Sequence, residues 1–289
     1  MRFAPISHDY HGRDEAPPKP SELRSVDGSD GPLTGYHPAM ELTILGASGA
    51  WPAPGGAANG FLVRTGGYHL VLDFGMAVLP NLQRYLPHEQ IDAIFVSHEH
   101  WDHCLDLYPL FLARFFRPDP LPPLPVFAPA GVFDRITAME DEEGAGEIRK
   151  SFEFREVEPG VDFEIGPFAV RTSLLPHWVP NLGMRLEAED RALAYTGDTG
   201  TSRDIETLAR EADVLIAEAS WLDGQDEGRD PYHLTARQAG IHAVGANVGR
   251  LVLTHFWPTN DREVSREQAA EVWEGPLTLA KEGLVLEVA

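Results

Sequence analysis

Short apolar runs alternate with amphipathic segments along most of the chain, and their order predicts the fold class. From Glu41 onward the runs are four to eight residues long, which is the length of a buried strand. Between many of them, apolar residues recur three and four positions apart, and this spacing predicts helices. Strands are expected at 41–45, 60–64, 68–74, 93–97, 124–129, 168–175, 183–187, 191–197, 213–220, 250–255, 277–280 and 284–288. Helices are expected at 76–85, 134–143, 202–212, 235–247 and 263–273, with a helix or a loop at 105–116.

This order of strands and helices fits two mixed β-sheets packed face to face and covered by helices. The expected fold class is therefore α/β (α+β), with four layers in the order αββα over residues 40–289. Residues 1–39 differ, because they are rich in Pro, Ser, Asp and Gly and have no periodic apolar pattern. Such a composition predicts a disordered N-terminal tail.

Charge and composition narrow the classes of partner. The 289 residues hold 23 Lys and Arg against 45 Asp and Glu, for a net charge of -22. This excess of acid repels nucleic-acid phosphates and anionic membranes, unless bound divalent ions supply a local positive charge. With no signal peptide and no apolar run of ~20 residues, a cytoplasmic protein without a membrane partner is expected. The single cysteine, Cys104, excludes an intrachain disulfide and is expected to be a small buried hydrophobe.

The segment 98–103 carries the strongest chemical signal. It reads His-Glu-His-Trp-Asp-His and follows directly on the expected strand 93–97. Three imidazoles and a carboxylate packed so closely are costly to bury unless they bind something, and they are ligands that suit zinc, manganese or iron. His98 and His100 are two positions apart on extended chain, so they point the same way, while Asp102 and His103 point elsewhere, toward a second metal.

Three further strand ends carry metal-type ligands. His177, Asp198 and His255 each follow an apolar run with the same chain polarity as the run before His98. Strands arranged in this way would gather the four ends at one edge of the sheets. Five histidines and two aspartates suffice for two divalent ions, with one aspartate bridging them and a hydroxide in the open position.

Together these motifs resemble the metallo-β-lactamase superfamily over nearly all of residues 41–289. The resemblance implies that one metal is held by His98, His100 and His177, and the other by Asp102, His103 and His255, with Asp198 as the bridge. The ions are expected to be zinc, with manganese or iron as alternatives. A drug-hydrolysing β-lactamase is disfavoured, since those enzymes are secreted and lack the aspartate bridge.

Two short elements are similar to the ribonuclease Z-like phosphodiesterases of this superfamily. They are Glu218-Ala219-Ser220 and His233-Leu234-Thr235, and the resemblance implies that His233 approaches the scissile phosphate while Glu218 holds it. Ribonuclease Z also carries a basic arm that grips tRNA, whereas the stretch from Val126 to His177 is short and acidic here. The chain looks closer to actinobacterial ribonuclease Z-like proteins, which include atypical class II cyclic-nucleotide phosphodiesterases.

The expected activity is hydrolysis of a small phosphodiester, with a 3′,5′-cyclic nucleotide as first choice. In this scheme the metals activate the attacking water, Asp102 and Asp198 hold the metals and orient the hydroxide, and His233 protonates the leaving alkoxide. The alternatives are a tRNA 3′-processing endoribonuclease, a lactonase or thioesterase, and a non-enzymatic nucleotide-binding or metal-binding module. The resemblance also implies a homodimer. Five aromatic residues beside the motifs are expected as wall and core, although they could stack a nucleobase: Trp101, Trp221, Tyr232, Phe256 and Trp257.

Overall fold

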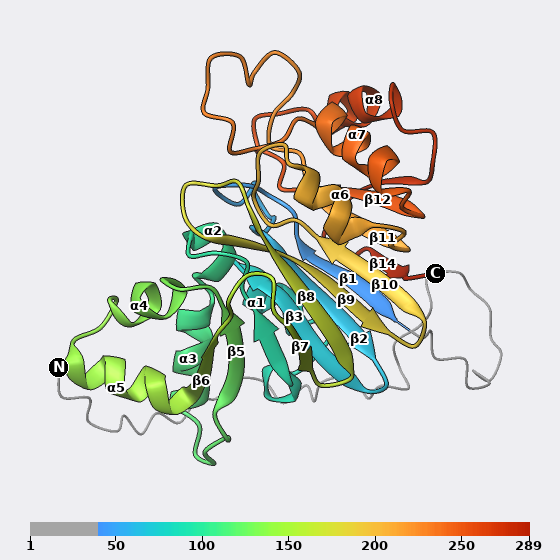
Figure 1. Ribbon diagram of the computed structural model, residues 1–289. Helices are drawn as coiled ribbons and strands as arrows, with labels where there is room; N and C mark the ends of the chain where they lie inside the picture. Colours follow the sequence, from blue (N-terminus) through green and yellow to red (C-terminus); the bar gives the residue numbers. More distant parts are fainter. Residues whose placement is uncertain (1–39) are drawn as a thin grey trace, which may run out of the picture. The chain divides into compact units, whose positions relative to one another are not determined.

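The computed structural model describes residues 40–289, and within that range it contains two seven-stranded β-sheets (Figure 1). The first sheet has the order β14-β1-β2-β3-β4-β5-β6, and β3 to β6 run parallel. Its strands are β1 (Glu41–Gly46), β2 (Gly60–Thr65), β3 (Tyr68–Phe74), β4 (Ala93–Phe95), β5 (Leu124–Ala128), β6 (Phe152–Glu156) and β14 (Val285–Glu287).

The second sheet has the order β13-β12-β11-β10-β9-β8-β7, and β10 to β13 run parallel. Its strands are β7 (Asp162–Ile165), β8 (Phe168–Leu175), β9 (Asn181–Ala188), β10 (Arg191–Tyr195), β11 (Val214–Glu218), β12 (Arg250–Thr254) and β13 (Leu277–Leu279). Because β8 and β10 both pair antiparallel with β9, β8 shares the direction of β10. The carboxyl ends of β8, β10, β11 and β12 therefore meet at one edge of this sheet.

Helices cover the outer face of each sheet (Figure 1). They are α1 (Val78–Leu82), the 3-10 turn η2 (His88–Gln90), α2 (Trp101–Cys104), α3 (Leu107–Phe115), α4 (Val132–Thr137), α5 (Glu142–Ser151), α6 (Arg203–Ala209), α7 (Ala236–Ala246) and α8 (Arg262–Ala270). One hydrophobic cluster lies between the sheets, a second packs under α1, α3, α4 and α5, and a third packs under α6, α7 and α8. The predicted α/β (α+β) class with four αββα layers is confirmed.

The region after β5 departs from the sequence prediction. A single helix was expected at 134–143, but the chain forms α4 and then α5, and it continues into β6 and β7. Asp141 begins the second helix, since its side chain accepts a hydrogen bond from the backbone N–H of Gly144. Only Ala145 and Ile148 of α5 are buried, so its apolar periodicity is weak in the sequence. Strand β7 lies at a sheet edge and spans four residues, which gives it too short an alternation to recognise.

Two smaller predictions have clear outcomes. Cys104 is fully buried within the hydrophobic cluster under α3, as predicted. Among the described helices none combines the length and the apolar character needed to cross a bilayer. The predicted disordered tail at 1–39 lies outside the described residues.

Candidate metal centre

The seven predicted ligand residues lie where the carboxyl ends of the strands meet. His98 follows β4, and His177, Asp198 and His255 follow β8, β10 and β12. The parallel strands bring these ends together, because each strand points its last residue toward the same edge. The donor atoms form two groups that share Asp198, and within each group they all lie within 4.8 Å of one another.

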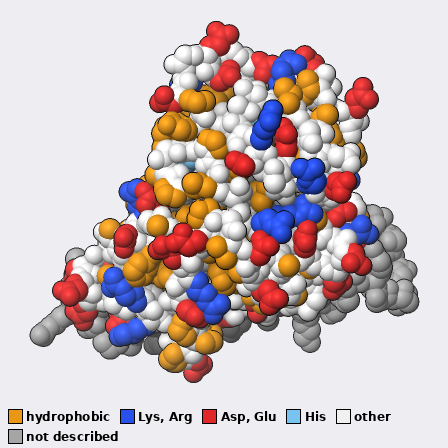
Figure 2. Space-filling view, viewed as in Figure 1, with side chains coloured by type: hydrophobic (Ala, Val, Ile, Leu, Met, Phe, Trp, Pro, Cys, Tyr) orange, Lys and Arg blue, Asp and Glu red, His pale blue; other side chains and the backbone are white. Residues whose placement is uncertain are grey.

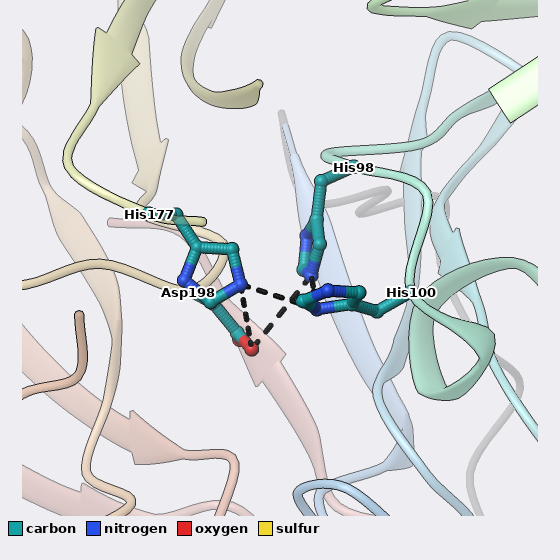
Figure 3. A group of neighbouring side chains, drawn as sticks. All are labelled: His98, His100, His177 and Asp198. Carbon is teal, nitrogen blue, oxygen red and sulfur yellow. Dashed lines mark hydrogen bonds and ion pairs between the residues drawn. The ribbon is translucent and has the colours of Figure 1, made fainter. Parts of the chain in front are cut away.

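The first group, which we call the open group, contains His98, His100, His177 and Asp198. Figure 3 shows their side chains pointing toward one another; His98 and His100 come from one segment, and His177 and Asp198 come from two others. His100 Nδ1 lies 3.0 Å from His98 Nε2 and 3.2 Å from His177 Nε2. Asp198 Oδ2 lies 3.8 Å from His98 Nε2 and 4.0 Å from His177 Nε2. The side chains of His98, His177 and Asp198 are buried, and His100 is the partly exposed member of this group.

The second group, the closed group, contains Asp102, His103, Asp198 and His255, and all four residues are buried. His103 Nε2 and His255 Nε2 lie 3.2 Å apart, and each lies 3.2 Å from Asp198 Oδ1. Asp102 Oδ2 is 3.1 Å from His255 Nε2 and 3.6 Å from His103 Nε2. Gly75 allows Asp102 to sit here, since a Cβ on this glycine would lie 1.8 Å from the Asp102 carbonyl oxygen.

The spacing of these donor atoms fits metal coordination. Ligands about 2.0–2.1 Å from a tetrahedral zinc are separated from one another by roughly 3.3 Å. The closest donor separations in both groups, 3.0 to 3.2 Å, are near that value. Asp198 Oδ1 is buried and has no hydrogen-bond partner among the described residues. A buried carboxylate oxygen without a partner is expensive, and a cation between it and the two nearby imidazoles would offset that cost.

Outer contacts fix the orientation of four of the five imidazoles. In each of the four, Nδ1–H donates a hydrogen bond, so Nε2 is the nitrogen directed at the centre. The acceptors are Ser97 Oγ for His98 at 3.0 Å, Asp73 Oδ2 for His103 at 2.6 Å, Ser220 Oγ for His255 at 2.8 Å and the Tyr232 carbonyl for His177 at 3.2 Å. The fifth, His100, presents Nδ1 instead. Each of the five predicted histidine ligands therefore directs one ring nitrogen at the centre.

Asp73 is a supporting residue that the sequence analysis did not identify. Its fully buried carboxylate accepts hydrogen bonds from His103, from the backbone and side chain of Ser97, and from the Tyr195 hydroxyl. Both Asp73 and His255 have positive φ, at 55° and 57°, in a region that non-glycine residues seldom occupy. A charge near the end of the otherwise apolar run 68–74 was the signal that could have revealed it.

The histidines of the open group and His103 of the closed group have pKa values shifted in opposite directions. Burial lowers the pKa of His98 and of His100, and it lowers the pKa of His177 to about 4. Burial also disfavours the charged form of His103, but the nearby carboxylates outweigh it and hold its pKa well above the usual value. The imidazoles of the open group are therefore neutral at neutral pH, while His103 is protonated in the metal-free protein.

His233 and Glu218 form a pair beside both groups. His233 Nδ1–H donates to Glu218 Oε1 at 3.0 Å and lies 3.9 Å from Asp198 Oδ2. Glu218 is fully buried and is also bound by the backbone N–H of Thr199 at 2.6 Å. Burial opposes the charge on His233, but Glu218 overcomes it and raises the pKa of the imidazole to about 9. The pair thus keeps a proton on a histidine next to the centre.

The aromatic residues divide into buried and exposed ones. Phe256 and Trp221 are buried, so they belong to the wall and the core. Trp101 is partly exposed, with the Arg135 guanidinium 5.5 Å from its ring centre. The most exposed aromatic ring at the centre is Trp178, at 57%, and the sequence analysis did not select it. The signal was its position directly after the predicted ligand His177.

Comparison with known proteins agrees with this geometry. The family described as a beta-lactamase superfamily domain matches residues 70–256. An uncharacterized protein of Mycobacterium leprae is 34% identical over 256 residues, covering 86% of this chain and 89% of its own length. The probable metallo-hydrolase YhfI of Bacillus subtilis is 30% identical over 254 residues, covering 86% of this chain and all of its own.

Two further matches concern structure and a named activity. The crystal structure of the Bacillus subtilis protein matches with a TM-score of 0.78 and 29% identity, covering 86% of this chain and 99% of that one. A ribonuclease Z of Mycolicibacterium gilvum is 31% identical over 248 residues, covering 76% of this chain and 85% of its own.

Proposed function

The chain belongs to the β-lactamase superfamily and is a metal-dependent hydrolase, and from this premise we propose that it is a two-metal phosphodiesterase. The superfamily is the one that the motifs predicted. The proposed substrate is a small phosphodiester, with a 3′,5′-cyclic nucleotide as first choice. The observation that carries the proposal is the His233–Glu218 hydrogen bond of 3.0 Å, placed beside a shared set of seven metal-type ligands.

The open and closed groups would hold the two divalent ions, with Asp198 between them. When bound, such ions supply positive charge for the phosphate oxygens and lower the pKa of an attacking water. Zinc is the first choice because it is commonly bound by imidazole and carboxylate ligands in this arrangement. Manganese and iron can be bound by the same ligands. The ligand side chains contribute orientation, since their outer hydrogen bonds fix where each lone pair points.

His233 acts in this proposal as the general acid. Glu218 occupies Nδ1, so Nε2 is the atom that can deliver a proton to the departing oxygen. With a pKa of about 9, the imidazole carries that proton at neutral pH. A ribose alkoxide is a poor leaving group that needs the proton, which favours an alkyl phosphodiester as substrate. Thr199 and Ser220 hold the Glu218 carboxylate through hydrogen bonds, so the acid is kept in place.

A tRNA 3′-processing nuclease is the second candidate, and the similarity to ribonuclease Z favours it. The charge of this chain argues for a smaller substrate. Residues 129–176, between β5 and His177, hold eleven acidic against five basic side chains and form α4, α5, β6, β7 and β8. On the face drawn in Figure 2, basic side chains are interspersed with acidic ones and do not form a continuous basic track. Few phosphates of an RNA would be neutralised by such a surface.

A hydrolysis panel on one metal-loaded sample tests the proposal. The substrates are cyclic nucleotides, a precursor tRNA, a lactone and a thioester. We expect cyclic nucleotide turnover to exceed the others, and weak tRNA binding with a shallow dependence on salt. Efficient trimming of the precursor tRNA at physiological salt, with no turnover of cyclic nucleotides, would reverse the ranking of the two candidates.

A further inference from the structure

Trp178 is an exposed aromatic ring fixed against the candidate centre. Its ring centre lies 5.2 Å from that of His177, 6.0 Å from His100 and 5.5 Å from His233. These three residues belong to the open group and to the acid pair. In spite of these contacts, 57% of Trp178 is exposed, so much of the residue is open to a ligand. A ligand bound at the open group would lie next to this surface.

The backbone around Trp178 is restrained. The residue lies in the bend between β8 and β9, between Pro176 and Pro180, and proline fixes the backbone angle φ at both positions. The Pro176 carbonyl accepts a hydrogen bond from the backbone N–H of Gly200 at 2.9 Å, and the Tyr232 ring packs against the indole with centres 5.4 Å apart. The exposed ring is therefore held in place before any ligand binds, which lowers the entropic cost of stacking on it.

We propose that Trp178 is the platform on which the base of a nucleotide substrate stacks. This inference rests on the proposed phosphodiesterase function and narrows its substrate class to nucleotides. In a cyclic nucleotide a single ribose joins the phosphate to the base, so a base can reach a ring that borders the metal ligands. Stacking uses the face of a ring and needs no charge, so it suits a protein with a net charge of -22. On the face shown in Figure 2, hydrophobic side chains surround a small exposed area of histidine.

The kinetic test compares a substrate that has a base with one that lacks it. Trp178→Leu keeps an apolar side chain but removes the aromatic face, and Trp178→Phe keeps a smaller face. We expect Trp178→Leu to raise KM for 3′,5′-cyclic AMP on the order of 10- to 100-fold, and to raise KM for the abasic ribose cyclic phosphate far less. Trp178→Phe should recover most of the loss. The matched control is Phe116→Ala, which removes a 63% exposed aromatic residue directly after α3 and should change neither KM.

A binding measurement keeps the inference testable if no cyclic nucleotide is hydrolysed. Tryptophan fluorescence of the zinc-loaded protein is titrated with AMP and with ribose 5-phosphate, which has the phosphate but no base. We expect AMP to bind at least about 10-fold more tightly than ribose 5-phosphate. This difference should be lost in Trp178→Leu and kept in Phe116→Ala, and it would support stacking on Trp178 even if the proposed activity fails. Equal affinities for the two ligands, or equal losses on both in Trp178→Leu with the metal content intact, overturn it.

Discussion

The closed group and the open group share Asp198 but differ in charge and in exposure. The closed group combines two histidines with Asp102 and Asp198, and Asp73 places a third carboxylate against His103. The open group combines three histidines with Asp198 alone; its His100 is partly exposed, and His100 and His177 both lie against the exposed Trp178. The closed group is therefore buried and rich in negative charge, whereas the open group is more accessible and has one carboxylate.

This difference separates two tasks that a hydrolytic centre has to perform. Negative charge in a buried site raises the affinity for a dication, because the interaction is weakly screened there. Access to solvent lets substrate and product exchange, and neutral imidazoles do not repel an anionic phosphate. We therefore expect the closed group to hold its ion more tightly, and the open group to be the side on which the substrate binds. The following predictions test this division.

Removal of the shared ligand should have the largest effect. Asp198→Ala takes the carboxylate from both groups, so we expect kcat to fall by on the order of 10³-fold or more on every substrate. Elemental analysis should show that bound metal falls with activity. Asp119→Ala, which removes an exposed carboxylate elsewhere, is the control and should change neither quantity. Full activity in Asp198→Ala would mean that the two groups do not share a ligand.

Replacement of His233, the proposed general acid, should lower the rate mainly on substrates with a poor leaving group. His233→Ala should lower the rate on a cyclic nucleotide by about 10²–10⁴-fold, because a ribose alkoxide needs a proton to leave. The loss on bis(p-nitrophenyl) phosphate should be far smaller, since p-nitrophenolate is a stable anion. The metal content should stay unchanged. An equal loss on both substrates, with the metals intact, would show that His233 binds phosphate or shapes the site and does not deliver the proton.

Loss of the Asp73 charge should weaken metal binding at the closed group only. Asp73→Asn keeps the size of the side chain but removes its charge from His103. Loss of such an outer partner typically lowers metal affinity by about 10–100-fold, and we expect this at the tighter of two sites in a calorimetric zinc titration. The weaker site should keep its affinity. If both sites weaken equally, the groups are coupled more closely than their different surroundings suggest.

Much of the fold and of the candidate centre could be predicted from local patterns. Strands such as 168–175 and 250–254 alternate or run apolar with clear ends. His177, Asp198 and His255 follow within three residues of the ends of β8, β10 and β12. The structure brings these residues together with the segment 98–103. Their roles as ligands stay a prediction until metal is measured.

The parts that could not be predicted depend on contacts between distant segments. Asp73 is separated from Tyr195 by 122 positions, so no local pattern links the carboxylate to the hydroxyl that binds it. The exposure of Trp178 depends in the same way on how the bend between β8 and β9 packs against Tyr232. The helix α5 was missed because only two of its residues reach the core, which leaves little periodicity to detect.

The smallest expected effect is a difference in proton release between the two groups. In the metal-free protein burial disfavours the charged His103, but Asp198 and then Asp73 keep its pKa well above the usual value, so it is protonated near pH 7. A metal at the closed group must displace the proton from Nε2, whereas His98, His100 and His177 have lowered pKa values and are already neutral. Binding at the closed group should therefore release about one proton and weaken about 10-fold per unit of falling pH, and binding at the open group should release none.

Zinc titrations in buffers with different heats of ionisation measure this release directly for each site. In Asp73→Asn one of the charges that raises the pKa of His103 is gone, so we expect the tighter site to release less than one proton near pH 7. The open group serves as the internal comparison. Asp73 reaches its His98 only through the Ser97 hydroxyl, and in Asp73→Asn the amide oxygen can still accept that hydrogen bond. Equal proton release at both sites in the unmodified protein would contradict the proposed difference between the closed and open groups. It would mean that the histidines of both groups have the same protonation state before metal binds.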